Sequence, residues 1–147
     1  MSAQPSPRNI LQELLDGIAN RRWVELHRLY AEDALVEYPF ALPAPFRLQG
    51  REAIRQYFAT LSTLPFAMRP RDIVMHETND AEVVVVQWNY DVDVKTTGRS
   101  FEVANIQVST VRHGKIIASR DYHNHFAMAE GFGRLEALLS SFSTRRE

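Results

Sequence analysis

The sequence predicts an α+β domain in which three helices pack on one face of an antiparallel sheet. Two observations carry this prediction. Up to Leu61 the apolar residues recur at helical spacing, whereas after Pro70 they form long runs rich in valine, isoleucine and aromatic residues, broken by short turns. The length of 147 residues suits a single domain with one core.

The helical segments are marked by stripes of apolar side chains. We expect a first helix closed by Asn20, a shorter second helix, and a third that begins after Gly50. A strand-like stretch at 34–38 ends at Pro39, and the three prolines of PFALPAPFRLQG predict a loop or a rigid extended arm. The stripes consist of Ile10, Leu11, Leu14, Leu15 and Ile18, then Trp23, Leu26, Leu29 and Tyr30, then Ile54, Tyr57, Phe58 and Leu61.

The second half predicts a meander of four strands. Tight turns at Asn79-Asp80, Thr97-Gly98 and Arg112-His113-Gly114 would join them. We expect further helix near Leu135, Leu138 and Leu139. The organisation predicted is a flexible arm at 1–7, a single domain at 8–142 and a tail at 143–147. The strands are expected at 71–77, 82–95, 99–112 and 115–124.

Composition excludes several classes of function. The chain has 17 Lys and Arg against 18 Asp and Glu, so its net charge of −1 argues against a nucleic-acid partner. It has no cysteine, which rules out disulfides, thiolate metal sites and a cysteine nucleophile. No apolar run approaches the roughly 20 residues of a membrane span, and the first residues do not resemble a secretory signal. We therefore expect no membrane partner and a cytoplasmic location.

The turns decide which side chains meet, because they set the register of the strands. We expect a two-residue loop at Thr97-Gly98 and a three-residue loop with a bulge that ends at Gly114. A two-residue loop at His113 would instead move Asp121 to the opposite sheet face. The expected pairs are Val92 with Val103, Tyr90 with Asn105, Trp88 with Gln107, Asn105 with Asp121, Val103 with His123 and Gln107 with Ser119.

This register gives the two sheet faces different characters. One is an aromatic floor with a few convergent polar groups, as small-molecule pockets usually have. It carries Trp88, Tyr90, Val92, Val103, Asn105, Gln107, Ser119, Asp121 and His123. The other is mixed with an apolar patch, so we expect a homodimer to form through it. It carries Ile106, Val108, Thr110, Ile116, Ala118, Arg120 and Tyr122, with Gln87, Asn89 and Asp91 beside them.

Four segments stand out in the chain: "LYAEDALVEYPF", "GREAIRQYF", "TTGRSFEVANIQVSTVRHGKI" and "RDYHNH". They resemble segments of the SnoaL-like proteins of the superfamily named after nuclear transport factor 2, and the likeness covers about residues 8–130. It implies a cone-shaped barrel of three helices wrapped by a curved antiparallel sheet, with no metal and no cofactor. The superfamily includes polyketide cyclases, ketosteroid isomerases, epoxide hydrolases, dehydratases and binding proteins without catalysis. The fold alone therefore does not choose a reaction.

Two motifs, "TGRSFE" and "RDYHNH", are similar to those of limonene-type epoxide hydrolases. That family uses an Asp–Arg–Asp constellation with a tyrosine and an asparagine that hold water. The resemblance places Asp121 at the final aspartate and Tyr38 at the tyrosine. Phe40 stands in place of the asparagine, and Tyr90 and Val92 stand in place of the arginine and the other aspartate. SnoaL-type cyclases instead work with one acid/base on the equivalent last strand, a role that Asp121 fits.

Asp121 is the leading catalytic candidate. Among Trp88, Tyr90 and apolar walls its carboxylate would be desolvated, which raises the pKa toward a range useful for removing a proton beside a carbonyl. The alternative is an aspartate that only pairs with Arg120 or His123. His123 itself is either an acid/base partner near neutral pH or a core histidine satisfied by a hydrogen bond.

The remaining candidates would bind substrate. Asn105 and Gln107 either hold a developing enolate oxygen or form a structural network. The pocket wall would comprise Tyr38, Phe40, Trp88, Tyr90 and Val103. A metal site built from Asp121, His123 and His125 with His27 or His76 has a real His-x-His spacing, but no further ligand is anchored by spacing, so we expect none.

The predicted function is a cofactor-independent cyclisation or isomerisation of a mid-sized apolar molecule, cyclic or polyketide-like. Asp121 would act as the base and His123 as its partner. Two alternatives remain open at this point. In one, the protein is an epoxide hydrolase or dehydratase in which Asp121 activates water. In the other, it is a non-catalytic protein that binds a small ligand.

Overall fold

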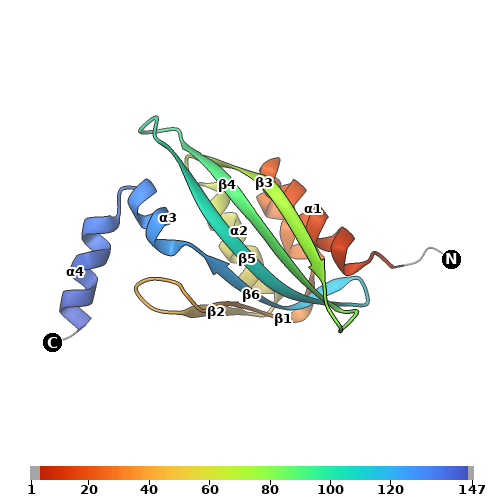
Figure 1. Cartoon of the computed structure of the whole chain (residues 1–147). Coiled ribbons are helices and arrows are strands. Elements are labelled where there is room, and N and C mark those ends of the chain that lie inside the picture. Colours follow the sequence, from red (N-terminus) through yellow and green to blue (C-terminus); the bar gives the residue numbers. More distant parts are fainter. Residues whose placement is uncertain (1–3, 146–147) are drawn as a thin grey trace.

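A single six-stranded sheet with helices on its concave side makes up the computed structural model, which describes residues 4–145 (Figure 1). Residues 1–3 of the expected arm and 146–147 of the expected tail lie outside the described residues. In chain order the elements are α1 (Pro7–Ala19), the 3₁₀ helix η1 (Trp23–Leu29), β1 (Tyr30–Tyr38), β2 (Phe46–Gln49), α2 (Arg51–Ser62), β3 (Phe66–Glu77), β4 (Val83–Val94), β5 (Ser100–Arg112), β6 (Lys115–His123), α3 (His125–Gly131) and α4 (Leu135–Arg145).

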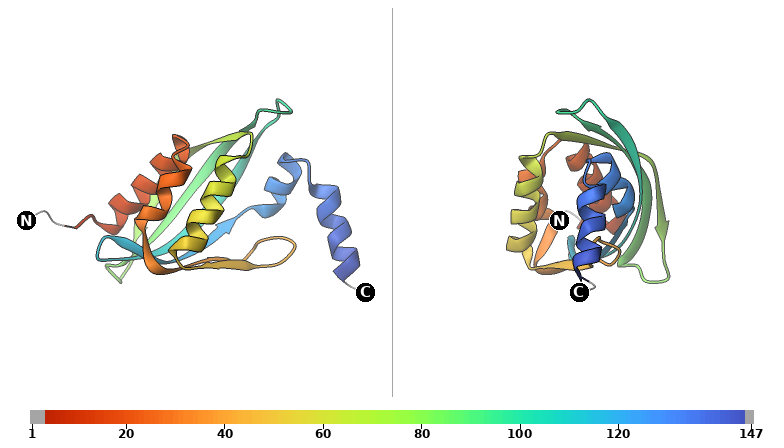
Figure 2. Two further views of the ribbon diagram at one scale, coloured as in Figure 1. Left: turned by 180° about the vertical axis from the view of Figure 1, so that it is seen from behind. Right: turned by 90° about the vertical axis from the view of Figure 1, so that its left-hand side faces the viewer.

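The predicted α+β fold class is confirmed. The strand order is β2-β1-β6-β5-β4-β3, and the sheet curves around α1 and α2 without closing (Figure 2, right). Neighbouring strands are antiparallel, except that β1 and β6 are parallel. In the chain these two strands are separated by β2, α2, β3, β4 and β5. No helix within residues 4–145 is long and apolar enough to cross a membrane.

Local sequence explains the ends of the helices. Ser6 caps α1 by accepting a hydrogen bond from the Asn9 amide, and Pro7 occupies the first turn, where its missing N–H is not needed. Asn20 closes the helix as expected, with its own amide N–H bonded to the Asp16 carbonyl. The second predicted helix is a 3₁₀ helix that ends at Leu29. Tyr30, which we expected on its apolar stripe, is the first residue of β1.

Two strands differ from the prediction. The Pro-rich segment, expected as a loop or a rigid extended arm, contains β2, a short edge strand paired with β1. Strand β3 begins at Phe66 rather than at residue 71 and passes through Pro70. Proline is tolerated there because β3 is the other edge of the sheet, where half of the backbone N–H groups have no partner strand.

The helices and the sheet bury one continuous core. Helix α1 contributes Leu11 and Leu15, and α2 contributes Ile54, all fully buried. Trp23 lies between Phe58 and Phe66, with ring centroids 6.2 and 6.1 Å away. These contacts hold the helical layer over the concave sheet face and fill the narrow end of the cone.

The register of β4 and β5 is shifted by two positions from the prediction. The Val94 amide bonds to the Arg99 carbonyl and the Gly98 amide to the Val94 carbonyl, so the loop contains four residues instead of two. Asn105 therefore opposes Trp88, whereas we expected Tyr90. The pairs observed in place of the predictions are Trp88 with Asn105, Tyr90 with Val103 and Val86 with Gln107. A slip of two positions keeps every side chain on its predicted face.

The turn between β5 and β6 also differs. Arg112 pairs with Lys115 across a two-residue turn, His113-Gly114, whose φ angles of 51° and 73° are typical of a type I′ hairpin. Such a turn alone would have moved Asp121 to the outer face. The register shift after Val111 leaves Ile117 as an extra residue on β6, and this bulge restores the alternation.

The bulge has opposite consequences for the two ends of β6. Beyond it, Asp121 lies on the concave face opposite Gln107, and His123 lies opposite Asn105. Before it, Ile116 is fully buried in the core, so its predicted place on the outer face is wrong. The remaining outer-face residues of β6, Ala118, Arg120 and Tyr122, are at least partly exposed as expected.

Candidate active site

Two cross-strand rows bring the candidate residues together on the concave face. One row runs from Val86 through Gln107 to Asp121. The next runs from Trp88 through Asn105 to His123. Because strands β4, β5 and β6 are adjacent, residues about 35 positions apart in the chain become neighbours.

Asp121 is buried, with 6% of its surface exposed. Burial raises the pKa of its carboxyl from 3.8 to about 7, and a hydrogen bond from Ser119 opposes part of that rise. Near neutral pH the carboxyl is therefore present in both protonation states. This is the condition under which a carboxylate serves as a general acid and base.

A chain of buried hydrogen bonds leads to Asp121. Gln107 Nε2 donates to Ser109 Oγ at 2.9 Å, the Ser109 and Ser119 Oγ atoms are 3.0 Å apart, and Ser119 Oγ donates to Asp121 Oδ1 at 2.5 Å. Each hydroxyl carries one hydrogen, so when Asp121 is ionised Ser109 must donate to Ser119. The donors then all point toward the carboxylate, and Oδ2 is left for a reacting molecule.

His123 is held by a second pair of hydrogen bonds. Asn105 Nδ2 donates to the Val103 carbonyl at 3.0 Å, which turns Asn105 Oδ1 toward His123 Nδ1 at 2.6 Å. Burial lowers the pKa of His123 to about 3, so the ring is neutral at pH 7. The Nδ1 hydrogen faces Asn105, and Nε2 presents a lone pair that can accept a hydrogen bond.

Three buried tyrosines and one partly buried tyrosine surround this polar strip. Burial raises the pKa of each hydroxyl, and the nearby charge of Asp121 raises it further. The hydroxyls therefore stay protonated, and those of Tyr38 and Tyr57 are hydrogen-bonded to each other. The four are Tyr30 and Tyr38 from β1, Tyr57 from α2 and Tyr90 from β4.

The structure brings most of the predicted site residues together. Tyr38 and Trp88 flank the His123 ring at centroid distances of 5.9 and 6.2 Å, and Tyr90 packs edge-on to Trp88. Phe40 does not join them. Its side chain is 65% exposed and contacts Tyr122, which belongs to the outer face. The residues that do lie on the concave face are Tyr38, Trp88, Tyr90, Val103, Asn105, Gln107, Asp121 and His123.

The histidines considered as metal ligands do not converge. His76 bonds to Gln87 through Nε2, and Gln87 is exposed, while His27 lies beside Arg51 and Arg55 at the start of α2. Within residues 4–145 no group of three or more His, Cys, Asp or Glu side chains is arranged to hold a metal ion.

A cleft of about 290 Å³, hereafter the mouth cleft, lies where α3 and α4 meet the β1–β2 loop. Both helices stand at the open end of the cone, in front of the space between the helical layer and the sheet (Figure 2, right). The His125 ring lies 5.8 Å from that of His123, which connects the cleft to the concave face. The lining residues are Leu42, Pro43, His125, Met128, Ala129, Arg134, Ala137, Leu138 and Ser141.

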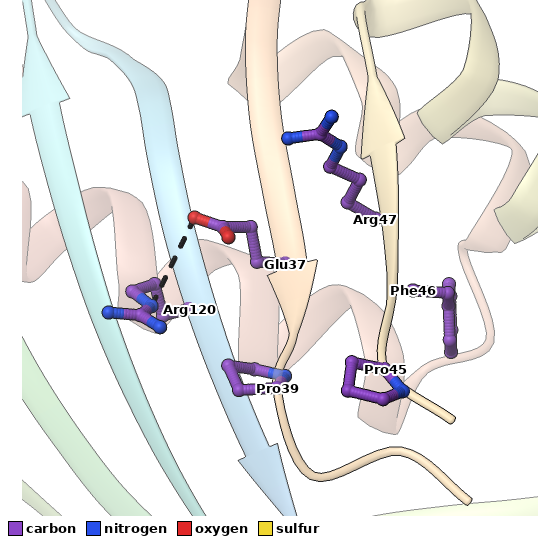
Figure 3. Close-up of a pocket in the computed structure, with 6 residues that line it drawn as sticks. All are labelled: Glu37, Pro39, Pro45, Phe46, Arg47 and Arg120. Carbon is purple, nitrogen blue, oxygen red and sulfur yellow. Dashed lines mark ion pairs between the residues drawn. The ribbon is translucent and has the colours of Figure 1, made fainter. Parts of the chain in front are cut away.

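A second cleft, of about 310 Å³, lies on the outer side of β1, β2 and β6 (Figure 3). Glu37 faces Arg120 at 4.0 Å across it, and Arg47 stands on the neighbouring strand. Proline rings and Phe46 form the rest of its wall. None of the buried candidate residues lines it, so we do not assign the chemistry to this cleft.

Some residues of the site were not singled out in the sequence. Ser109 and Tyr57 were missed, although Ser109 continues the alternation of Asn105 and Gln107 and was detectable by that signal. Arg134 was missed because it lies between two short helices, where no periodicity indicates which way a side chain points.

Known proteins share this fold. A family model described as the SnoaL-like domain matches residues 11–119. The uncharacterized protein YesE of Bacillus subtilis (strain 168) is 28% identical over 114 residues, which are 77% of this chain and 76% of that protein.

Solved structures give a similar result. A candidate isomerase from Bacillus subtilis superposes with a TM-score of 0.80 at 24% identity, covering 87% of this chain and 93% of that one. A candidate polyketide cyclase from Pseudomonas putida KT2440 gives a TM-score of 0.73 at 12% identity, covering 86% and 98%. At these identities the structural matches establish the fold.

Proposed function

Because the chain belongs to the SnoaL-like domain family, we propose that it is a cofactor-independent cyclase or isomerase that acts on a mid-sized apolar carbonyl compound. The observation that carries this proposal is a buried carboxyl, Asp121, whose pKa lies at about 7. A group of this kind can remove a weakly acidic proton and return it at the same pH. The names of the similar structures, an isomerase and a polyketide cyclase, agree with this reaction class.

The reaction begins when Asp121 removes a proton from the carbon beside a carbonyl group. The electron pair of the broken C–H bond moves into an enolate, and the proton remains on the Asp121 carboxyl. Return of this proton to another carbon completes an isomerisation. In a cyclisation the enolate carbon instead attacks a second carbonyl carbon and closes a ring, and the oxygen of that carbonyl takes the proton from Asp121. Ser119 keeps one carboxylate oxygen occupied, so that Oδ2 takes the proton.

The polar groups beside Asp121 suit the developing enolate. The side-chain amides of Asn105 and Gln107 each use one N–H within the protein and retain a second for a substrate oxygen. The protonated hydroxyl of Tyr90 is a further donor. The neutral His123 ring can accept a hydrogen bond from a substrate hydroxyl through Nε2.

Epoxide hydrolysis of the limonene type is less well supported. It requires an arginine between two aspartates, and the second aspartate available in this region is Asp91. Its carboxylate instead binds Arg71 at 2.8 Å. Asp91 alternates with Tyr90 and Val92, which lie on the concave face, so Asp91 points to the outer face. A binding protein without catalysis remains the competing interpretation, and turnover distinguishes the two.

Deuterium exchange tests the proposal directly. In D₂O the wild-type protein is expected to exchange the protons beside the carbonyl of an apolar bicyclic ketone such as 2-tetralone faster than buffer alone. The rate, followed by proton NMR, should rise with pH through about 7 and then level off, because the ionised form of Asp121 is the base.

The variants make this test specific. Asp121→Asn is expected to fall to the buffer rate, whereas Asp93→Asn, which changes an exposed carboxylate, should retain the wild-type rate. Equal exchange in the wild type and Asp121→Asn would show that Asp121 is not the base. The absence of any acceleration at pH 8 would favour a binding protein.

We also propose that the protein forms a homodimer through the outer sheet face. Val74, Gln87, Ile106 and Tyr122 form one row across four strands there, and Val74 and Ile106 are 42% and 45% exposed. Burial of such a row against a second copy removes apolar surface from water. Ile106→Asp is expected to convert a dimer to a monomer in light scattering, while Val24→Asp, an exposed valine on η1, should not. A wild-type monomer at all concentrations would contradict this.

A further inference from the structure

The mouth cleft contains polar groups that the proton transfer at Asp121 does not use. His125 Nε2 is buried and has no hydrogen-bond partner among the described residues. A buried N–H or ring nitrogen of this kind costs free energy unless a partner arrives. The atom belongs to a residue that lines the cleft, so a bound molecule can supply the partner.

Arg134 provides a positive charge at the same cleft. Its guanidinium lies 5.4 Å from the centre of the Phe132 ring, and no described carboxylate lies within 4.0 Å of it. Arg134 is exposed, and its charge opposes a small part of the rise in pKa that burial causes at the Tyr57 hydroxyl. An anion in the mouth cleft would therefore meet an arginine whose donors are not engaged by a carboxylate of the protein.

The rest of the cleft is apolar. Leu42 from the β1–β2 loop, Met128 from α3 and Leu138 from α4 form three of its walls. Its volume of about 290 Å³ is close to the lower end of the range for small-molecule pockets, roughly 300–1,000 Å³. This size suits a molecule of one or two rings.

We propose that the mouth cleft binds the carboxylate group of a small amphiphilic acid, with Arg134 and His125 as its polar partners and Leu42, Met128 and Leu138 against its apolar body. This assignment deepens the proposed function, because it makes an acid with an apolar ring system the substrate class. Binding itself requires no catalysis.

The charges also give the acid an orientation. Asp121 lies deeper in the cone and is partly ionised at neutral pH, so it repels a carboxylate placed inside. Arg134 attracts the same group to the rim. The apolar end of the molecule is therefore directed past His125 toward His123 and Asp121, where the proton transfer takes place.

A pair of probes that differ only in the polar group tests this assignment. The dissociation constants of 2-naphthoate and 2-naphthalenemethanol are measured at pH 7 by isothermal titration calorimetry. The wild type is expected to bind the acid about tenfold more tightly than the alcohol, as a charge-assisted pair with arginine allows. Arg134→Gln should abolish this preference and leave the affinity for the alcohol unchanged, while Arg134→Lys should keep part of it.

Controls separate this result from a loss of folding. Arg69→Gln removes an exposed arginine that is paired with Asp93, and it should preserve the preference for the acid. Circular dichroism confirms that each variant is folded. In the wild type the naphthoate should also raise the pKa of His125, which burial holds below its ordinary value in the free protein.

Equal affinity for the acid and the alcohol would overturn the assignment, and so would an acid preference that survives Arg134→Gln. Combining the binding measurement with deuterium exchange keeps the two proposals apart. Asp121→Asn should lose the exchange and keep the preference for the acid. A preference for the acid without any deuterium exchange in the wild type supports the carboxylate site and rejects the enzyme. Exchange without the preference supports the enzyme and rejects the carboxylate site.

Discussion

Asp121→Asn is expected to stabilise the protein by about 4 kcal/mol more at pH 8 than at pH 3.5. The pKa of Asp121 rises from 3.8 in the unfolded chain to about 7 in the folded protein because the carboxyl is buried. Between these two values the folded state holds a proton that the unfolded state has lost. The free energy of unfolding of the wild type therefore decreases as pH rises through this window, and asparagine, which does not titrate, avoids the loss.

Urea unfolding of both proteins at several pH values between 3.5 and 8 measures this effect. The difference between variant and wild type should grow through pH 4–7 and then remain constant. Asp93→Asn serves as a control of opposite sign, because hydrogen bonds from Ser100 and Arg69 lower the pKa of that exposed carboxyl. A difference for Asp121→Asn that does not change with pH would show that the carboxyl is not desolvated.

When the pH falls from 7 to 4, the free energy of unfolding of His123→Gln is expected to rise by about 3 kcal/mol relative to that of the wild type. Burial lowers the pKa of His123 from 6.5 to about 3, so at pH 4 the unfolded chain binds a proton that the folded protein does not. The wild type therefore loses stability as pH falls below 6.5. Glutamine does not titrate, and its amide can still donate to Asn105 Oδ1.

The comparison is made between pH values, since His123→Gln also loses ring contacts with Tyr38 and Trp88 at every pH. Unfolding by urea at pH 4, 5, 6 and 7 gives the slope, and the NMR titration of the His123 ring gives its pKa independently. A constant difference between the two proteins, or a ring that titrates near pH 6, would contradict the neutral buried state.

Together the two groups predict an unusual pH dependence. Between pH 4 and 6.5 the loss from Asp121 and the gain from His123 oppose each other with similar slopes. The contribution of the site to stability is therefore nearly flat in this range and declines above it. A protein that keeps such a pair sacrifices stability at neutral pH for a carboxyl that can exchange protons there.

Much of the fold was predictable because secondary structure follows local periodicity. Stripes of apolar residues located α1 and α2, and alternation located β4, β5 and β6 to within a few residues. The 3₁₀ geometry of η1 and the edge strand β2 were not predictable in this way. Short elements have too few residues for a period, and their form depends on the neighbours against which they pack.

The candidate site was also predictable only in part. By itself the sequence determined that Asn105 and Gln107 share one face of their strand and that Asp121 and His123 share one face of theirs, since alternation along a strand is a property of the backbone. The turn and the bulge between the two strands placed both pairs on the concave face. The tertiary structure decided which of them touch. A four-residue turn, a two-residue turn and a bulge at Ile117 set the pairs, and none of these is visible in the alternation.

The same holds for the chemistry of Asp121. The sequence gives its residue type, but a pKa of about 7 arises from desolvation by segments far apart in the sequence. Helix α2 and strands β1, β4 and β5 must all come together before water is excluded from the carboxyl. A carboxyl in the unfolded chain is solvated whatever its neighbours in sequence, so its reactivity exists only in the folded molecule.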